Sequence, residues 1–185
     1  VPLRRGFTGE LYAITGALVP SLAVGERGNL LTCWETIPHE ILRYRGERLV
    51  QYEVSGHEDG RTVVQFGNPH WRVNKPIANR TLHGLAEDGS CIVAVGQSGR
   101  IHRSQVAGDW IRCSSPTLNN LRAVHFSAPQ GLWVCVGREV ICTSTNSKDW
   151  KLAVIPRPVN LNAVAFGRGC WVAMGERGCL LRSVD

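Results

Sequence analysis

The sequence lacks long apolar runs and blocks of like charge. No stretch approaches the roughly 18 apolar residues that a membrane-spanning helix needs. The net charge is +6 and the sequence pI is near 9.2, but basic and acidic residues are interspersed throughout. Tails that bind nucleic acid usually concentrate five or six like charges. We therefore predict no transmembrane segment and no nucleic-acid partner, which still allows contact with a membrane complex.

Metal-ligand and disulfide patterns are also missing. The seven cysteines are an odd number, include no CxxC pair and do not group with the six histidines. Most lie inside apolar runs such as SCIVAVG, LWVCVG and REVICTS, which is typical of buried free thiols. We predict no metal, no cofactor and an intracellular, reducing compartment.

Helical periodicity is missing as well, and a repeat takes its place. No segment keeps a 3.6-residue apolar period over the 11 or more residues that a helix would need. Trp34, Trp71, Trp110 and Trp150 instead lie 37, 39 and 40 residues apart. In register with them are SLAVG (21–25), YEVSG (52–56), IVAVG (92–96), WVCVG (133–137) and WVAMG (171–175). Five copies in register indicate an internal repeat.

Each repeat is built from short segments of strand type. The fourth copy, for example, reads LRAVHF, WVCVG, EVICTS and then WKLAVI. The segments are about five residues long, rich in Val, Ile, Leu and aromatic residues, and bounded by turn residues. Four short antiparallel strands per repeat are the unit of a propeller blade. We predict an all-β fold, a small β-propeller with five four-stranded blades.

Two turns carry a more specific pattern, SQVAGDW (104–110) and STNSKDW (144–150). Ser144, Asn146 and Trp150 occupy the three positions of an Asp-box turn, whereas Val106 stands at the acidic position of the first turn. With the glycine-ended runs, these segments resemble BNR-like, Asp-box propeller repeats, a group that includes photosystem II assembly and stability factors and, more distantly, sialidases. The resemblance implies that these residues close the hairpin between the third and fourth strands. WD40 repeats fit less well, because Gly-His is missing and the order is Asp-Trp.

The repeats are expected to form one domain over residues 1–185. Their approximate limits are 8–33, 34–70, 71–109, 110–149 and 150–185. The last copy ends after its third strand, whereas VPLRRGF (1–7) precedes the first strand of the first copy. We expect residues 1–7 to pair with 179–183, complete the last blade and close the ring. The alternative is a portion of a longer propeller with six or seven blades.

The recurring tryptophans and glycines are expected to be structural. They are Trp34, Trp71, Trp110, Trp150, Gly25, Gly56, Gly96, Gly137 and Gly175. The turns GERG (25–28), GQSG (96–99) and GERG (175–178) lead into strands, whereas a phosphate loop leads into a helix N-terminus. We therefore interpret them as hairpin turns that need positive φ.

Catalytic patterns are not found. A sialidase needs a tyrosine nucleophile, yet Tyr12, Tyr44 and Tyr52 have no recognisable catalytic context. No Ser/His/Asp set shares a locus, and no cysteine has a clear activating neighbour. We predict that the protein is not an enzyme and has no catalytic residue.

One charged set recurs in every repeat. The turn after the second strand contains Arg27, Arg61, Arg100, Arg138 or Arg177. These turns share one face of a propeller, so the sequence predicts a crown of arginines that binds a partner. Alternatively, Glu26, Glu58, Asp59, Glu139 and Glu176 neutralise the crown through ordinary surface pairs, each worth under about 1 kcal/mol.

Two classes of function are compatible with these features. The first is a non-enzymatic scaffold that binds protein, as an assembly factor or an accessory subunit of a larger complex. The resemblance implies a photosynthetic or organellar membrane complex in a plastid or other organelle. The second is a lectin-like propeller that binds glycans or anions. It is disfavoured because only the structural Trp and Gly recur, not a shared set of ligand-binding residues.

Overall fold

The computed structural model describes residues 11–15, 21–28, 30–33, 52–58, 61–66, 71–73, 77–105, 109–155 and 157–184. Their regular structure consists of β-strands and single 3-10 turns, with no α-helix in these ranges. The predicted all-β fold is confirmed.

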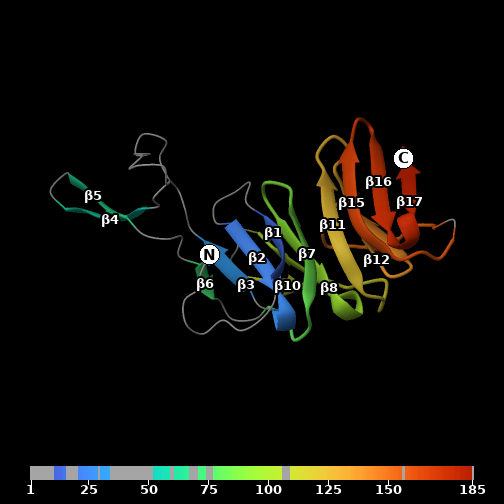
Figure 1. Cartoon of the computed structure of the whole chain (residues 1–185), viewed down its shortest axis with the longest axis horizontal. Helices are drawn as coiled ribbons and strands as arrows, with labels where there is room; N and C mark the ends of the chain where they lie inside the picture. The colour runs from blue at the N-terminus through green and yellow to red at the C-terminus, as the bar shows by residue number, and fades with distance from the viewer. Residues whose placement is uncertain are drawn as a thin grey trace.

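Most strands form four antiparallel sheets that follow one another along the chain (Figure 1). The first contains β1 (Leu11–Thr15), β2 (Ser21–Gly25), β3 (Leu30–Cys33) and β6 (Trp71–Val73). The second contains β7 (Leu82–Glu87), β8 (Ile92–Gly96), β9 (Ile101–Ser104) and β10 (Ile111–Arg112). The third contains β11 (Leu121–Ser127), β12 (Leu132–Gly137), β13 (Val140–Ser144) and β14 (Lys151–Leu152). The fourth contains β15 (Leu161–Gly167), β16 (Cys170–Gly175) and β17 (Leu180–Ser183).

The four sheets repeat one register. Each first strand opens with a leucine opposite the glycine that ends the second strand, and a bulge follows. These pairs are Leu11 with Gly25, Leu82 with Gly96, Leu121 with Gly137 and Leu161 with Gly175. The first strands lie beside one another in the order β1, β7, β11 and β15. Sheets that pack face to face around their first strands have the arrangement of propeller blades.

The predicted composition of the first two blades is wrong. The sequence pattern divided this region into a first repeat at about 8–33 and a second repeat at about 34–70 that opens at Trp34. In the structure β6 pairs with β3, with Trp71 opposite Cys33, so Trp71 opens the fourth strand of the first sheet. The length of the segment between the tryptophan and the next opening leucine is consistent with Trp71, and not Trp34, as the start of this fourth strand. Trp71 stands eleven residues ahead of Leu82, the spacing that also separates Trp110 from Leu121 and Trp150 from Leu161.

The intervening segment contributes a separate hairpin. The strands β4 (Tyr52–Glu58) and β5 (Arg61–Phe66) pair with each other and lie away from the four sheets (Figure 1). The described residues therefore contain three four-stranded sheets, one three-stranded sheet and this hairpin. They do not confirm five four-stranded blades. Trp34 lies outside the described residues.

Apolar clusters fill the spaces between neighbouring sheets. Between the second and third sheets, Trp133 and Trp150 are 1% and 7% exposed and pack with Val93 and Cys135. Trp171 lies between the third and fourth sheets, and the half-buried Trp110 packs at the boundary of the first two. This packing agrees with the structural role predicted for Trp110 and Trp150, which stays a prediction. The sequence analysis did not single out Trp133 and Trp171, which are equally embedded.

The turn between β13 and β14 is closed as predicted from Ser144, Asn146 and Trp150. The Asn146 side-chain oxygen accepts the backbone N–H groups of Lys148 and Asp149 at 2.9 and 2.8 Å. The Trp150 indole N–H donates to the Ser147 carbonyl at 3.1 Å. Residues 106–108 of the corresponding turn in the second sheet lie outside the described residues.

The predicted ring closure is not tested by the structure. Residues 1–10 lie outside the described ranges, and so does their expected pairing with residues 179–183. β17 pairs with β16 along one edge. No strand among the described residues pairs with its other edge.

Candidate functional site

The turns after the second strands all project from the same end of the sheets (Figure 1). Three are 3-10 turns: η1 (Glu26–Gly28), η3 (Gln97–Gly99) and η4 (Glu176–Gly178). The middle residues Arg27, Ser98 and Arg177 have φ between 52° and 55°. Gly99 and Gly178 also have positive φ, in agreement with turns that need positive φ.

The glycines that end the second strands do not supply the positive φ of these turns. Gly96 and Gly175 are extended, with φ of −170° and −151°. A Cβ on Gly96, Gly137 or Gly175 would lie 2.1, 2.0 and 2.0 Å from a backbone carbonyl oxygen. That oxygen belongs to the residue before the first strand and accepts the N–H of the residue after the glycine at 2.8–2.9 Å. Close backbone approach, rather than backbone torsion, requires glycine here.

Four of the five predicted arginines lie at these turns. Arg27, Arg138 and Arg177 are exposed, and Arg100 is half-buried with its Nη2 donating to the Asn79 side-chain oxygen at 3.2 Å. Arg61 opens β5 in the separate hairpin, opposite Glu58, so it does not belong to a turn of the four sheets. The predicted crown of five is therefore reduced to four, which we call the arginine face.

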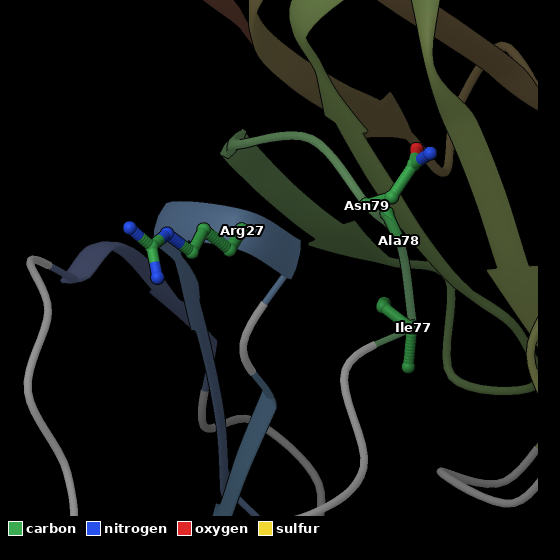
Figure 2. Close-up of a pocket in the computed structure, with 4 residues that line it drawn as sticks. All are labelled: Arg27, Ile77, Ala78 and Asn79. Atoms are coloured by element: carbon green, nitrogen blue, oxygen red, sulfur yellow. The ribbon is translucent and has the colours of Figure 1, made fainter.

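Arg27 borders an open depression beside the first sheet. Its other described lining residues, Ile77, Ala78 and Asn79, lie on the segment leading to the second sheet (Figure 2). The Arg27 guanidinium extends away from that segment, and the Asn79 side chain points away from Ile77 (Figure 2). The depression is thus bordered by the exposed Arg27 and by an amide that Arg100 already engages.

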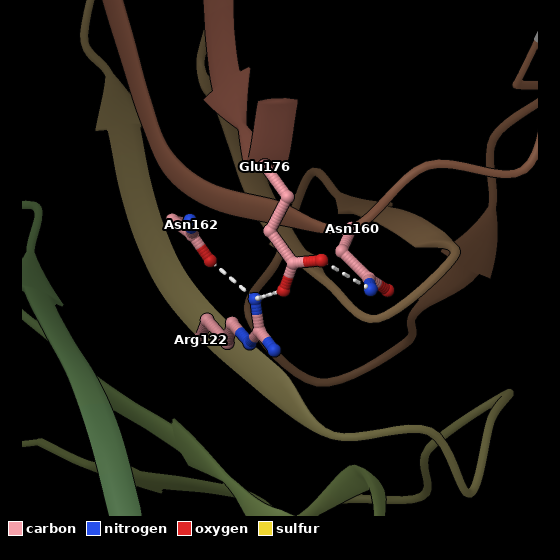
Figure 3. A network of polar contacts seen from close by, with 4 residues as sticks. All are labelled: Arg122, Asn160, Asn162 and Glu176. Atoms are coloured by element: carbon pink, nitrogen blue, oxygen red, sulfur yellow. Dashed lines mark hydrogen bonds and ion pairs between the residues drawn. The ribbon is translucent and has the colours of Figure 1, made fainter. Parts of the chain in front are cut away.

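A polar network joins the third and fourth sheets at the same face (Figure 3). Arg122 Nη1 donates to Glu176 Oε1 at 3.0 Å and to the Asn162 side-chain oxygen. Asn160 Nδ2 donates to the other Glu176 oxygen at 2.9 Å. The hydrogen bond from Asn160, followed by that from Arg122, lowers the pKa of Glu176. Glu176 is therefore held ionised between two sheets.

Because of this network, Glu176 does not neutralise the neighbouring arginine as the alternative from the sequence expected. Glu176 adjoins Arg177 in sequence but forms its ion pair with Arg122. Within the described part of the chain, neither Arg138 nor Arg177 forms an ion pair. Two exposed guanidinium groups on this face are therefore available to a ligand.

Arg122 also belongs to a row that sequence analysis missed. Tyr12, His83, Arg122 and Asn162 are each the second residue of a first strand, and those strands lie side by side. The Tyr12 and His83 rings contact edge to face with centroids 5.3 Å apart. Burial and, to a lesser extent, the charge of Arg122 lower the pKa of His83. The sequence could have revealed this row, because each of its four residues directly follows the leucine that opens its strand.

The described residues contain no cluster of three or more His, Cys, Asp or Glu that could hold a metal ion. The cysteines with described side chains, Cys91, Cys113, Cys135, Cys142, Cys170 and Cys179, are free thiols. In the described part of the chain, no helix has the length and apolar character to cross a membrane.

Comparison with known proteins identifies the architecture. No family model matches the sequence, and a search of curated proteins gives no match. Among solved structures, the computationally designed Ika4 protein matches with a TM-score of 0.63 and 12% identity, over 98% of this chain and 94% of Ika4. YCF48 bound to a D1 peptide matches with a TM-score of 0.62 and 12% identity, over 96% of this chain and 49% of YCF48. The WD40 β-propeller domain of Doa1 matches with a TM-score of 0.53 and 9% identity, over 92% of this chain and 50% of Doa1.

These similarities support a β-propeller fold. The sheet order and the packing of the first strands independently agree with it. The chain spans about half the length of the YCF48 and Doa1 structures that it matches. At these low identities the likeness shows the fold alone.

Proposed function

We propose that this chain is a non-enzymatic propeller scaffold whose arginine face binds an acidic segment of a protein partner. Arg138 and Arg177 carry the proposal because both are exposed and free of ion pairs within the described residues. Guanidinium groups pair with carboxylates through two parallel hydrogen bonds, which suits them to protein interfaces. Arg27 adds a third exposed guanidinium group to this face, at the border of the depression.

The row on the first strands would contribute shape and polarity to the same interface. Tyr12 is 45% exposed and the Arg122 side chain is 33% exposed, so both can contact a bound segment. Bonds to Glu176 and Asn162 orient the Arg122 guanidinium before any partner arrives. Such preorganisation reduces the conformational entropy lost on binding.

The structural neighbours suggest a setting for this role. YCF48 has been captured with a D1 peptide, and it shares the propeller fold with this chain. Together with the resemblance of the repeats to photosystem II assembly factors, this supports an assembly factor or accessory subunit of a photosynthetic membrane complex in a plastid. The BNR-like character of the repeats and the single domain over residues 1–185 belong to the same proposal.

The test compares charge reversals at opposite ends of the sheets. Arg138→Glu with Arg177→Glu alters the arginine face, whereas Lys148→Glu with Arg168→Glu alters exposed turns at the other end. Both pairs change the net charge equally. Binding of a D1 peptide is measured by fluorescence anisotropy at low and high salt. We expect the first pair to weaken low-salt binding by about tenfold and to flatten the salt response.

The control pair should change the affinity by less than about threefold, since screening weakens charges far from the interface. Equal losses in both pairs would mean that net charge, and not this face, governs binding. Peptide binding unaffected by either pair would move the interface to another surface. Retention of the wild-type chain on a glycan array, without peptide binding, would favour the lectin-like alternative.

A further inference from the structure

The chain places one of its own carboxylates on the arginine face. Glu176 Oε1 accepts from Arg122 Nη1 at 3.0 Å, and Glu176 Oε2 accepts from Asn160 Nδ2 at 2.9 Å (Figure 3). These hydrogen bonds lower the pKa of Glu176, so the group is ionised at neutral pH. Arg122 therefore already holds the kind of group that an acidic partner would bring to this face.

The contact between Arg122 and Glu176 is open to exchange. The two side chains are 33% and 48% exposed, and an ion pair that water and salt screen to this extent adds little to stability. Arg122 Nη1 also donates to the Asn162 side-chain oxygen. That second hydrogen bond can keep the guanidinium in place when another carboxylate replaces Glu176.

The repeat does not require this ion pair. Glu176 directly follows the glycine that ends its second strand, and Arg122 directly follows the leucine that opens the first strand of the preceding sheet. At the other two junctions between sheets, the same two positions are occupied by Tyr12 with Gln97 and by His83 with Arg138. Neither combination joins an acid to a base, so two junctions of the same fold form without an ion pair at these positions.

Two unpaired cations flank the occupied one. Arg177 follows Glu176 along the chain, and Arg138 lies at the turn of the neighbouring third sheet. Both are exposed and form no ion pair within the described residues. A carboxylate that reaches this face can bind either of them directly, whereas it must displace Glu176 to gain full use of Arg122.

We propose that Glu176 is an internal competitor of the acidic partner and occupies Arg122 until a partner carboxylate replaces it. This inference rests on the proposed function, because it concerns the same face and the same class of ligand. The exchange gives up one ion pair for another and gains little by itself. A segment with several carboxylates also reaches Arg138 and Arg177, so the competitor selects such segments over single anions.

Glutamine substitutions at two glutamates of this face test the competition. Glu176→Gln removes the carboxylate from Arg122, whereas Glu139→Gln removes an exposed carboxylate that forms no ion pair in the described part of the chain. Both change the net charge equally. We expect Glu176→Gln to raise the affinity for the D1 peptide about fivefold, measured by fluorescence anisotropy, and Glu139→Gln to raise it less than about twofold. A role of Glu176 in stability alone would not raise the affinity.

Arg122→Gln completes a double-mutant cycle with Glu176→Gln. If Glu176 acts by occupying Arg122, its substitution has nothing to release once the guanidinium is gone. In the Arg122→Gln background, Glu176→Gln should therefore raise the peptide affinity no more than Glu139→Gln does. A full increase without Arg122 would overturn the inference.

Acetate is a probe that needs no protein partner. Its binding is followed by the NMR resonance of the Arg122 Nε–H group, which is assigned by its loss in Arg122→Gln. We expect the acetate concentration at half-saturation to be at least about threefold lower in Glu176→Gln than in the wild type and in Glu139→Gln. Equal half-saturation in all three proteins would overturn the inference, whatever the peptide does.

The competition and the proposed function fail in different ways. If no variant binds the peptide but acetate still distinguishes Glu176→Gln, the proposed function is wrong and the competition at Arg122 stands. If the peptide binds but both glutamine variants raise its affinity equally, or Glu176→Gln lowers it, the competition is wrong and the proposed function stands.

Discussion

At the scale of single residues, Gly137 shows how close backbone contacts determine sequence. It ends β12, and an added Cβ would lie 2.0 Å from the Asn120 carbonyl oxygen. Neither backbone atom can move freely, because Arg138 N–H donates to the same oxygen at 2.8 Å. Gly167 at the end of β15 has no atom within 4 Å of an added Cβ. Two glycines at strand ends therefore have opposite tolerance to substitution.

We predict that Gly137→Ala lowers the free energy of unfolding by about 2 to 3 kcal/mol, the cost of overpacking a tight site. Gly167→Ala should be neutral or slightly stabilising, because it only restricts the unfolded chain. Urea denaturation of both variants and the wild type checks this. Equal urea midpoints for the two variants would contradict this prediction, because they would show that the Asn120 carbonyl moves away from the added Cβ with no loss of stability.

Because of His102 on β9, we expect the free energy of unfolding to depend on pH. It is 5% exposed, and its Nδ1 has no hydrogen-bond partner among the residues that the structure describes. Burial, followed by the charges of Arg100 and Arg112, lowers the pKa of His102 to about 4. In the unfolded chain the pKa of this histidine is near its ordinary value of 6.5, so between pH 4 and pH 6.5 the unfolded state binds more protons than the folded state. Stability from this group is therefore complete above about pH 6.5 and is lost as the pH falls toward 4.

The expected loss between pH 7 and pH 5 is about 2 kcal/mol, measured as a fall in the free energy of unfolding. His102→Gln should reduce this slope. A residual slope of the same sign is expected, because burial also lowers the pKa of His83 and His125. An unchanged slope in the variant would mean that His102 is not the main titrating group.

At the scale of elements, local patterns were predictable and contacts across sheets were not. Ser144, Asn146 and Trp150 lie within one seven-residue turn, and the resemblance of this turn to an Asp-box implied that its residues close the hairpin, where Asn146 and Trp150 do form hydrogen bonds. Arg122 and Glu176 are 54 residues apart, and their pairing depends on how two sheets pack. The repeat alone was enough to locate the charged residues at each turn. It was not enough to identify the residues with which they pair.

The prediction of the strand order in the first two repeats was wrong for a related reason. Trp34 and Trp71 are equally good openings of a fourth strand by local sequence, and both follow an apolar segment. The spacing from Trp71 to the opening Leu82 distinguishes them, because it matches the connections that lead into the third and fourth sheets. The repeat period alone does not decide between Trp34 and Trp71, because an inserted hairpin can be mistaken for a blade.

At the scale of the whole molecule, the sheets differ in how well their faces are covered. β12 of the third sheet lies between two clusters and is buried from Trp133 to Gly137. β16 occupies the same position in the fourth sheet, yet Met174 is 52% exposed, and Leu180 on the neighbouring β17 is 61% exposed. Neighbouring sheets stabilise one another, so the end of the array should open more easily than its centre.

Hydrogen exchange of the native chain should reveal this gradient. Both β12 and β16 are central strands with partners on each side, so their amides differ in packing and not in backbone pairing. We expect amides of residues 171–175 to exchange at least about tenfold faster than those of residues 133–137. Equal protection at low protein concentration would mean that another part of the same chain covers the fourth sheet, as in a closed ring. Protection of residues 171–175 that rises with concentration would instead identify a second copy on that face, because only intermolecular contacts respond to concentration.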